Sequence, residues 1–217
     1  MYKKHIKRIL DLLIGIIALP FFAVVFIVVA PIIHFTDGGP VFYNAERIGR
    51  NGKLFKMYKL RSMYVNAPDI RLADGSTYNG NDDPRVTKIG KFIRAASIDE
   101  LPQILNILNG TMSLIGPRPD PPDWLERYPE GIKVFLTVRP GITGYCQAYW
   151  RNGADGEEKM KADAYYATHV SFPFDVKIFI KSVLTVIGHS NTYKDLSNEQ
   201  DAVKAAEQIA EEADNKQ

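Results

Sequence analysis

The longest apolar segment of the chain lies near its beginning. Residues Leu12 to Ile33 form an unbroken run of 22 residues without a charged side chain. A run of about 18 or more such residues predicts a membrane-embedded helix rather than a buried core helix. A cleaved secretory signal fits less well, because its apolar core spans only ~7–15 residues and no small-residue cleavage site follows this run.

Both flanks of the apolar run are basic. Four basic residues precede it within positions 3–8, and six follow it within positions 47–61. Because basic flanks favour the cytoplasmic side, a simple crossing would place one flank on the disfavoured side. Pro20 lies near the middle of the run, where it would kink a helix, so the sequence predicts a re-entrant helix over residues 1–37. A straight span that tolerates the proline stays open.

The pattern changes after residue 40 to short alternating stretches around a turn-rich centre, Gly49-Arg50-Asn51-Gly52. This arrangement predicts a β-hairpin or two short strands. With a period of two, Lys59 and Arg61 share a face with Met57, and the basic end of that face is a candidate anion site. The solvated end of a strand explains such a basic pair equally well.

Later segments have apolar positions at helical spacing. Residues 97–109, which follow a basic helical stretch at 88–96, predict a helix packed on the core. Residues 176–187 have an apolar face flanked by Lys177 and Lys181, which is typical of an interfacial amphipathic helix and also of a core helix. The predicted fold class is α+β, mostly helical and monotopic, with a re-entrant membrane helix, a small β-hairpin and amphipathic interfacial helices.

Composition and charge refine this organisation. Hydrophobic residues make up 46% of the 217 residues and charged residues 24%, which excludes wholesale disorder. We expect a membrane helix at 1–37, a catalytic domain at 38–190 and a polar tail at 191–217. The net charge is +2, yet residues 193–217 hold seven acids against three lysines, so residues 1–192 carry about six excess positive charges. This basic body suits a surface facing anionic lipid headgroups.

Several function classes find no support in the sequence. Cys146 is the only cysteine, so no internal disulfide forms. The four histidines show no metal-binding spacing, which disfavours zinc chemistry. The sequence contains no Walker, Rossmann or serine-hydrolase motif. Basic residues beside a membrane segment, without a nucleic-acid-binding motif, also argue against a nucleic-acid partner.

The densest cluster of reactive side chains lies at residues 94–103, where Asp99 and Glu100 follow basic residues. Ser97, with Glu100 three positions later, fits a capping box at the start of a helix. The same position also suits chemistry, because the positive end of a helix dipole stabilises a carboxylate and attracts phosphate. An ionised aspartate there could attack phosphorus and form an acyl phosphate.

Phosphoryl groups also need cations. Lys59, Arg94 and the Arg118 of a Gly-Pro-Arg-Pro segment could supply them, with Mg²⁺ bridging carboxylate and phosphate oxygens. The prolines around Arg118 would fix its direction, although a rigid surface turn explains the same residues. A second basic, glycine-rich turn at Arg139-Pro140-Gly141 could also meet a phosphate.

Motifs along most of residues 1–189 resemble one family, the bacterial sugar transferases, also called monotopic phosphoglycosyl transferases. In chain order, the resemblance is carried by Gly39-Pro40-Val41-Phe42, Arg47-Ile48-Gly49-Arg50-Asn51-Gly52, Tyr58-Lys59-Leu60-Arg61-Ser62-Met63, the block from Ile89 to Pro119, Arg139 to Gly144, Asp163 with Tyr165 and Tyr166, and Phe174-Asp175-Val176-Lys177. So many motifs in one order are highly specific.

The resemblance implies a reaction and the residues that perform it. Asp99 would be the nucleophile and Glu100 its partner, with Mg²⁺ required and bound at this pair. A phosphosugar would pass from a UDP-sugar to polyprenyl (undecaprenyl) phosphate through a covalent Asp99 intermediate, with release of UMP. This would be the first membrane step of polysaccharide or glycoconjugate biosynthesis, on the cytoplasmic face of a bacterial cell membrane. The other active-site or phosphate-binding residues would be Lys59, Arg94, Arg118, Arg139 and Asp175.

Two features depart from the family's pattern. Well-known members carry Ser-Pro at the helix break, whereas Leu19 precedes Pro20 here, so a hydroxyl that could satisfy freed backbone groups is missing. Tyr149-Trp150 replaces the usual Asn-Gly before Arg-Asn.

A hydrolase of the same bond and a noncatalytic membrane-bound scaffold are the alternative functions, and the Asp-Glu pair argues against the scaffold. The transferred sugar, the glycan pathway and the oligomeric state, a homo-oligomer included, stay open.

Overall fold

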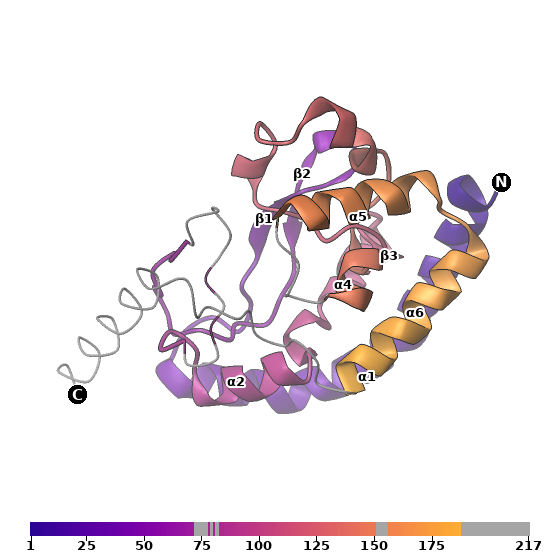
Figure 1. The fold of residues 1–217 in the computed structure, drawn as a ribbon. Helices are drawn as coiled ribbons and strands as arrows, with labels where there is room; N and C mark the ends of the chain where they lie inside the picture. Colours follow the sequence, from indigo (N-terminus) through magenta and orange to yellow (C-terminus); the bar gives the residue numbers. More distant parts are fainter. Residues whose placement is uncertain (72–77, 79, 81–82, 151–155, 188–217) are drawn as a thin grey trace.

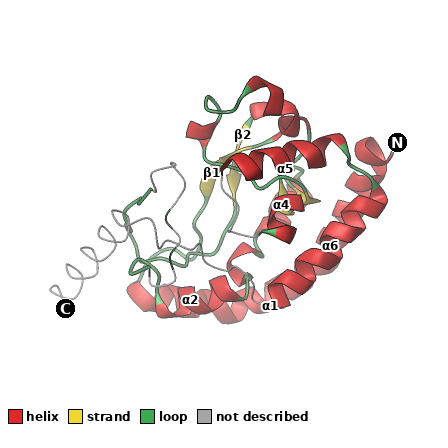
Figure 2. Cartoon of the chain, in the orientation of Figure 1, coloured by secondary structure: helices red, strands yellow, loops and turns green. Residues whose placement is uncertain are grey.

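The structure of the chain is a computed structural model that describes residues 1–71, 78, 80, 83–150 and 156–187. Helices surround two small sheets (Figures 1 and 2), in agreement with the predicted mostly helical α+β class. In this view a long helix, α1, passes along the bottom, α5 lies across the upper part, and α6 runs down one side. The predicted tail at 191–217 lies outside the described residues.

Helix α1 spans Lys7–Asp37 and follows a π-helical turn at Tyr2–Ile6. The helix predicted from the apolar run is confirmed, and by length and composition it can cross a membrane. Most of its large apolar side chains are exposed, unlike those of a core helix. Pro20 and Pro31 lie inside the helix, and each lacks the N–H group of a helical hydrogen bond. In Figure 1 the helix changes direction between its two halves, as an interior proline favours.

The residues that precede the apolar run contact the rest of the domain. Lys7 Nζ lies 2.7 Å from Asp175 Oδ2, and the Tyr2 hydroxyl donates to the same oxygen at 2.6 Å. Arg8 donates to two carbonyl oxygens in the last turn of α3 (Gln103–Asn109), at 2.6 and 3.2 Å. A cation there also interacts favourably with the helix dipole. The beginning of α1 is therefore fixed to the folded domain by charged contacts.

Asp11 attaches the next turn of α1 to a central strand. Its side chain is buried, and its Oδ1 accepts hydrogen bonds from Ser113 Oγ and from the backbone N–H of Leu114, both at 3.0 Å. Both donors belong to strand β3, Ser113–Ile115. Because a buried carboxylate is costly without donors, these two hydrogen bonds explain why an acidic residue is tolerated beside the apolar run.

We expect the Asp11→Ala variant to lose about 1–3 kcal/mol of stability, because it leaves the Ser113 hydroxyl and the Leu114 N–H group buried without an acceptor. Asp11→Asn keeps an acceptor oxygen and should lose less. Thermal unfolding in detergent micelles measures both effects, with Asp123→Ala in an exposed ion pair as the control. An unchanged unfolding temperature for Asp11→Ala would contradict this role.

Strands β1 (Ala45–Ile48) and β2 (Leu54–Met57) pair antiparallel along their whole length, so the predicted β-hairpin is confirmed. A 3-10 turn at Arg50–Gly52 connects them, and within it Asn51 and Gly52 have φ angles of 58° and 75°. Asparagine and glycine tolerate this left-handed conformation better than other residues, so the Asn-Gly pair allows the tight turn. The chain then leaves β2 toward the carboxylates of the candidate site.

The second sheet pairs β3 in parallel with β4, Gly141–Thr143. A Cβ atom at Gly141 would lie 2.1 Å from the backbone nitrogen of Gly116, so the close approach of the two chains requires glycine. The main core forms between this sheet and the helices around it. Its fully buried members include Ile115, Tyr166 and Ile178. The surrounding elements are α4 (Tyr145–Tyr149), α5 (Gly156–Thr168), α6 (Phe172–Ile187) and 3-10 turns at Pro122–Trp124 and Glu130–Thr137.

Helix α6 confirms the helix predicted near the end of the described chain. Ile178 packs into the core and is fully buried. The apolar face that the sequence pattern predicted for this helix is exposed instead. The exposed apolar residues are Val176, Phe179, Ile180, Val183 and Leu184. Of the two interpretations of this segment, the exposure favours an interfacial amphipathic helix over an ordinary core helix.

Candidate active site

The two adjacent carboxylates lie in a 3-10 turn, Ile98–Glu100, between α2 (Lys88–Ala95) and α3. The backbone N–H of Leu60 donates to the carbonyl oxygen of Asp99 at 2.9 Å and holds this turn against the chain that leaves β2. Asp99 is 2% exposed. The hairpin thereby places Lys59, the residue before Leu60, beside both carboxylates.

Two cations contact the carboxylate pair. Lys59 Nζ lies 3.0 Å from Asp99 Oδ2 and 3.3 Å from Glu100 Oε1. Arg118 Nη2 donates to Glu100 Oε1 at 2.8 Å. Two positive and two negative groups therefore balance within one cluster. A phosphate that enters the cluster would compete with the carboxylates for the same two cations.

The cations shift the protonation equilibrium of Glu100. Burial disfavours its charged form, but the charges of Arg118 and Lys59 and their hydrogen bonds outweigh burial and hold the pKa of Glu100 well below its usual range. The charge of Glu100 in turn raises the pKa of Arg118, against the opposing effect of burial. Glu100 is therefore a carboxylate at neutral pH and has no proton to donate there.

The helix start predicted at Ser97 is wrong. Ser97 has a φ of 56° and makes no capping hydrogen bond through its side chain, and α3 begins only at Gln103. In a continuous α-helix the carbonyl of Asp99 would accept the N–H of Gln103, whereas here it accepts the N–H of Leu60. Ser97 therefore forms no capping box, and Asp99 lies outside α3. The countercharge beside Asp99 comes from Lys59 instead.

The carboxylates line a cavity of about 1170 Å³. This volume exceeds the ~300–1,000 Å³ of typical small-molecule sites, so the cavity is large enough for more than one small ligand. Arg94 is held on its wall by a hydrogen bond from Nε to Ser62 Oγ at 2.8 Å. The predicted site residues that the structure brings together on this wall are Lys59, Arg94, Asp99, Glu100 and Arg118.

Arg139 and Asp175, which the resemblance also implied, do not line this cavity. Arg139 Nε donates to the carbonyl of Gly110 at 2.9 Å, and burial together with the charge of Arg8 lowers the pKa of Arg139. Asp175 accepts the hydroxyl of Tyr166 at 2.8 Å in addition to its contacts with the start of α1. Their contacts are structural, and a role in phosphate binding stays a prediction.

Sequence reasoning missed charged groups on the cavity wall. Arg47 lines the cavity, and burial together with the charge of Arg118 lowers its pKa. Lys159 lines it too, with Nζ 2.8 Å from Asp120 Oδ2 and 3.0 Å from Asp163 Oδ2. The conspicuous motif beside the hairpin turn could have drawn attention to Arg47. No local pattern links Lys159 to Asp120, 39 residues earlier.

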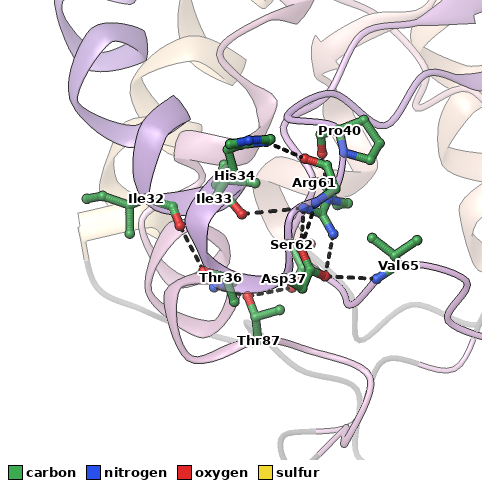
Figure 3. A network of polar contacts seen from close by, with 12 residues as sticks. Ile32, Ile33, His34, Thr36, Asp37, Pro40, Arg61, Ser62, Val65 and Thr87 are labelled. Carbon is green, nitrogen blue, oxygen red and sulfur yellow. Dashed lines mark hydrogen bonds and ion pairs between the residues drawn. The ribbon is translucent and has the colours of Figure 1, made fainter.

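Arg61 binds the end of α1 (Figure 3). Its Nη1 and Nη2 donate to the two carboxylate oxygens of Asp37, each at 2.6 Å. Its Nε donates to the carbonyl of Pro40 at 2.6 Å, and Asp37 also accepts the N–H of Val65 at 3.1 Å. Arg61 lines the cavity with Lys59, but Asp37 of the chain pairs with its guanidinium, so an anion site that uses both residues stays a prediction.

The donors of this site fit the Mg²⁺ ion that the resemblance implied. Among the residues that the structure describes, no group of three or more His, Cys, Asp or Glu side chains forms a complete metal cage. Mg²⁺ usually takes one or two carboxylates and completes its shell with waters and substrate phosphates. Oxygens of Asp99 and Glu100 both lie within 3.3 Å of Lys59 Nζ, so the two carboxylates converge and would hold the ion.

Comparison with known proteins gives consistent matches. Residues 2–189 match the family model described as Bacterial sugar transferase. The undecaprenyl-phosphate galactose phosphotransferase of Salmonella typhimurium is 34% identical over 207 residues, which cover 88% of this chain and 42% of the relative. The UDP-N-acetylgalactosamine-undecaprenyl-phosphate N-acetylgalactosaminephosphotransferase of Aeromonas hydrophila is 37% identical over 188 residues, or 84% and 44% of the two chains. The exopolysaccharide production protein ExoY of Sinorhizobium fredii is 37% identical over 198 residues, or 86% and 88%. The chain thus spans under half the length of the first two relatives and most of the third.

Proposed function

The chain belongs to the bacterial sugar transferase family, and from this premise we propose that it transfers a phosphosugar from a UDP-sugar to polyprenyl phosphate. The names of its relatives support both substrates, since two name undecaprenyl phosphate and one of them names a UDP-sugar. The observation that carries the proposal is a buried Asp99 beside Lys59, with Glu100 and Arg118 next to it, on the wall of one large cavity.

The chemistry takes two displacements at one phosphorus. A carboxylate oxygen of Asp99 attacks the sugar-bearing phosphorus of the UDP-sugar, an oxygen–phosphorus bond forms, and UMP leaves with the electron pair of the broken bond. A phosphate oxygen of the polyprenyl phosphate then attacks the same phosphorus, and the bond to Asp99 breaks. The product is a polyprenyl diphosphate sugar, and the carboxylate is regenerated. No proton needs to move, which suits a Glu100 that stays ionised.

The cations on the cavity wall supply the electrostatic stabilisation of the substrate phosphates. Lys59 and Arg118 are held by carboxylates in the free protein, and an arriving diphosphate offers them stronger partners. Transfer of Lys59 toward the phosphate would leave the Asp99 oxygen free to attack. Arg94 and Arg47 add positive charge on the same wall. Asp99 and Glu100 would hold Mg²⁺, which when bound would supply positive charge against the negative charge that develops on the phosphate.

Incubation of the purified protein with Mg²⁺ and a panel of UDP-sugars labelled in the sugar, without lipid, tests the proposal. We expect a labelled covalent adduct on Asp99 and an equal amount of UMP. Added undecaprenyl phosphate should then release the label as a lipid-linked sugar. Release of UMP that never yields a lipid-linked sugar would indicate a hydrolase, and a lack of adduct with every donor would contradict the nucleophile.

We also propose that α1 is re-entrant and that the domain lies on the cytoplasmic face of the bacterial cell membrane. Both ends of α1 contact the same domain, the first through Lys7 and Asp175 and the second through Asp37 and Arg61. A spanning helix would place its ends on opposite sides of a hydrocarbon layer ~30 Å thick. The bent course of α1 in Figure 1 and the basic residues on both of its flanks support the re-entrant arrangement.

Cysteine labelling tests this topology. Cysteines placed at the exposed positions Lys4 and Lys53, in a Cys146→Ser background, are expected to react with an impermeant maleimide from the same side of the membrane. Both should label in inside-out vesicles and stay protected in right-side-out cells. Labelling of the two positions from opposite sides would rule out the re-entrant helix.

A further inference from the structure

One edge of α6 belongs to both the cavity and the exposed apolar face. Phe179 and Val183, one helical turn apart, line the cavity that holds Asp99. They are also 47% and 42% exposed, and Ile180, the residue after Phe179, is exposed too. Contact between exposed apolar side chains and water is unfavourable. A partner with an apolar surface that reaches into the cavity would therefore bind favourably here.

The orientation of α6 is fixed on its opposite side. Ile178 is fully buried, the Ser182 and Thr143 hydroxyl oxygens lie 2.7 Å apart, and the Thr185 hydroxyl donates to the carbonyl of Ala148 at 2.9 Å. These contacts prevent α6 from rotating its apolar face into the core. The edge formed by Phe179 and Val183 is thus a rigid border between the cavity and the exterior.

The beginning of α6 is attached to the beginning of α1, whose exposed apolar side chains face the membrane in the proposed arrangement. The Lys7 and Tyr2 contacts to Asp175 tie the beginning of α6 to the beginning of α1, and the rings of Tyr2 and Phe172 meet edge to face at 5.9 Å. In Figure 2 α6 lies on the same side of the molecule as the beginning of the chain, marked N. A membrane that contacts the apolar side chains of α1 would therefore reach α6 and the mouth of the cavity beside it.

We infer that the edge formed by Phe179 and Val183 is the binding site for the first isoprene units of the polyprenyl phosphate acceptor. This inference rests on the proposed function. A UDP-sugar carries polar groups along its whole length and lacks the extended hydrocarbon chain that would match this edge. The acceptor joins an anionic head to an isoprenoid chain, so its phosphate can reach Lys59 and Arg118 while its chain leaves the cavity over α6 into the bilayer.

Paired variants separate this role from general membrane binding. Phe179→Ala with Val183→Ala removes the cavity edge, whereas Val176→Ala with Ile180→Ala removes similar exposed area, 39% and 53% exposed in the native chain, that does not line the cavity. In liposomes with undecaprenyl phosphate, we expect the first pair to raise the KM for the acceptor about tenfold and the second less than twofold. Donor-dependent adduct formation and co-sedimentation with liposomes should match wild type in both.

A second measurement does not require turnover. Farnesyl phosphate carrying a diazirine on its first isoprene unit, photolysed in liposomes with wild-type protein, is expected to label the α6 peptide that contains Phe179 and Val183. An equal rise in KM for both variant pairs, a loss of adduct formation in the first pair, or labelling confined to other elements would overturn the inference. If wild-type protein forms no adduct and no lipid-linked sugar while the probe still labels α6, the proposed function fails and the binding site stands.

Discussion

The Asp99→Asn variant is expected to form no covalent adduct and to lose turnover by at least about a thousandfold, because an amide oxygen is a poor nucleophile toward phosphorus. The exchange is nearly isosteric and sits in a buried turn, so the side chain should keep its place. The assay is release of UMP from a labelled UDP-sugar, followed by mass spectrometry of the tryptic peptide that contains residue 99. Full turnover by this variant would remove Asp99 from the mechanism.

Two controls make this result specific. Asp123→Asn changes an exposed carboxylate in an ion pair with Arg127 and should leave turnover unchanged. Glu100→Gln keeps the nucleophile but loses one of the charges that hold Lys59 and Arg118, so it should still form the adduct, more slowly. The unfolding temperature of each variant shows whether a loss of activity comes from the fold. An adduct on Asp99→Asn at the wild-type rate would place the nucleophile elsewhere.

The elements that could be predicted from the sequence depend on local pattern. The apolar run of α1, the Asn-Gly turn of the hairpin and the exposed apolar face of α6 each follow from residues close together in the chain. The start of α3 could not be predicted in this way. The N–H group of a distant residue, Leu60, donates a hydrogen bond to the carbonyl oxygen of Asp99. A 3-10 turn therefore forms where the local sequence favours a capping box.

The candidate site shows the same limit. The types and spacing of Asp99, Glu100 and Arg118 indicated phosphate chemistry, and the fold brings them together with Lys59. The partners of basic side chains are set by tertiary structure and are not visible in the sequence. Arg61 lies only two positions after Lys59. Its carboxylate partner, however, is Asp37 at the end of α1, which the local sequence does not reveal.

The second large effect is expected at this Asp37–Arg61 pair, which joins α1 to the segment after β2 that carries Lys59. Asp37→Ala should destabilise the fold by about 3–5 kcal/mol, because it leaves the buried guanidinium of Arg61 without its carboxylate. The double variant Asp37→Ala with Arg61→Met should recover most of this loss, since no buried guanidinium then remains without a countercharge. Denaturant unfolding in micelles measures both, and Glu130→Ala in the exposed Lys133 pair should change stability by less than about 1 kcal/mol.

The pH dependence gives an independent check on the same pair. Hydrogen bonds from Arg61 outweigh burial and lower the pKa of Asp37 in the folded chain below its unfolded value. The stabilisation is therefore complete above the unfolded pKa of about 4 and is lost as the pH falls through the lower folded pKa. Wild type should lose more stability than the double variant between about pH 5 and pH 2, because only wild type must protonate this carboxylate on unfolding at low pH. Equal acid sensitivity of the two proteins, or no recovery in the double variant, would show that the pair does not hold α1 to the catalytic segment.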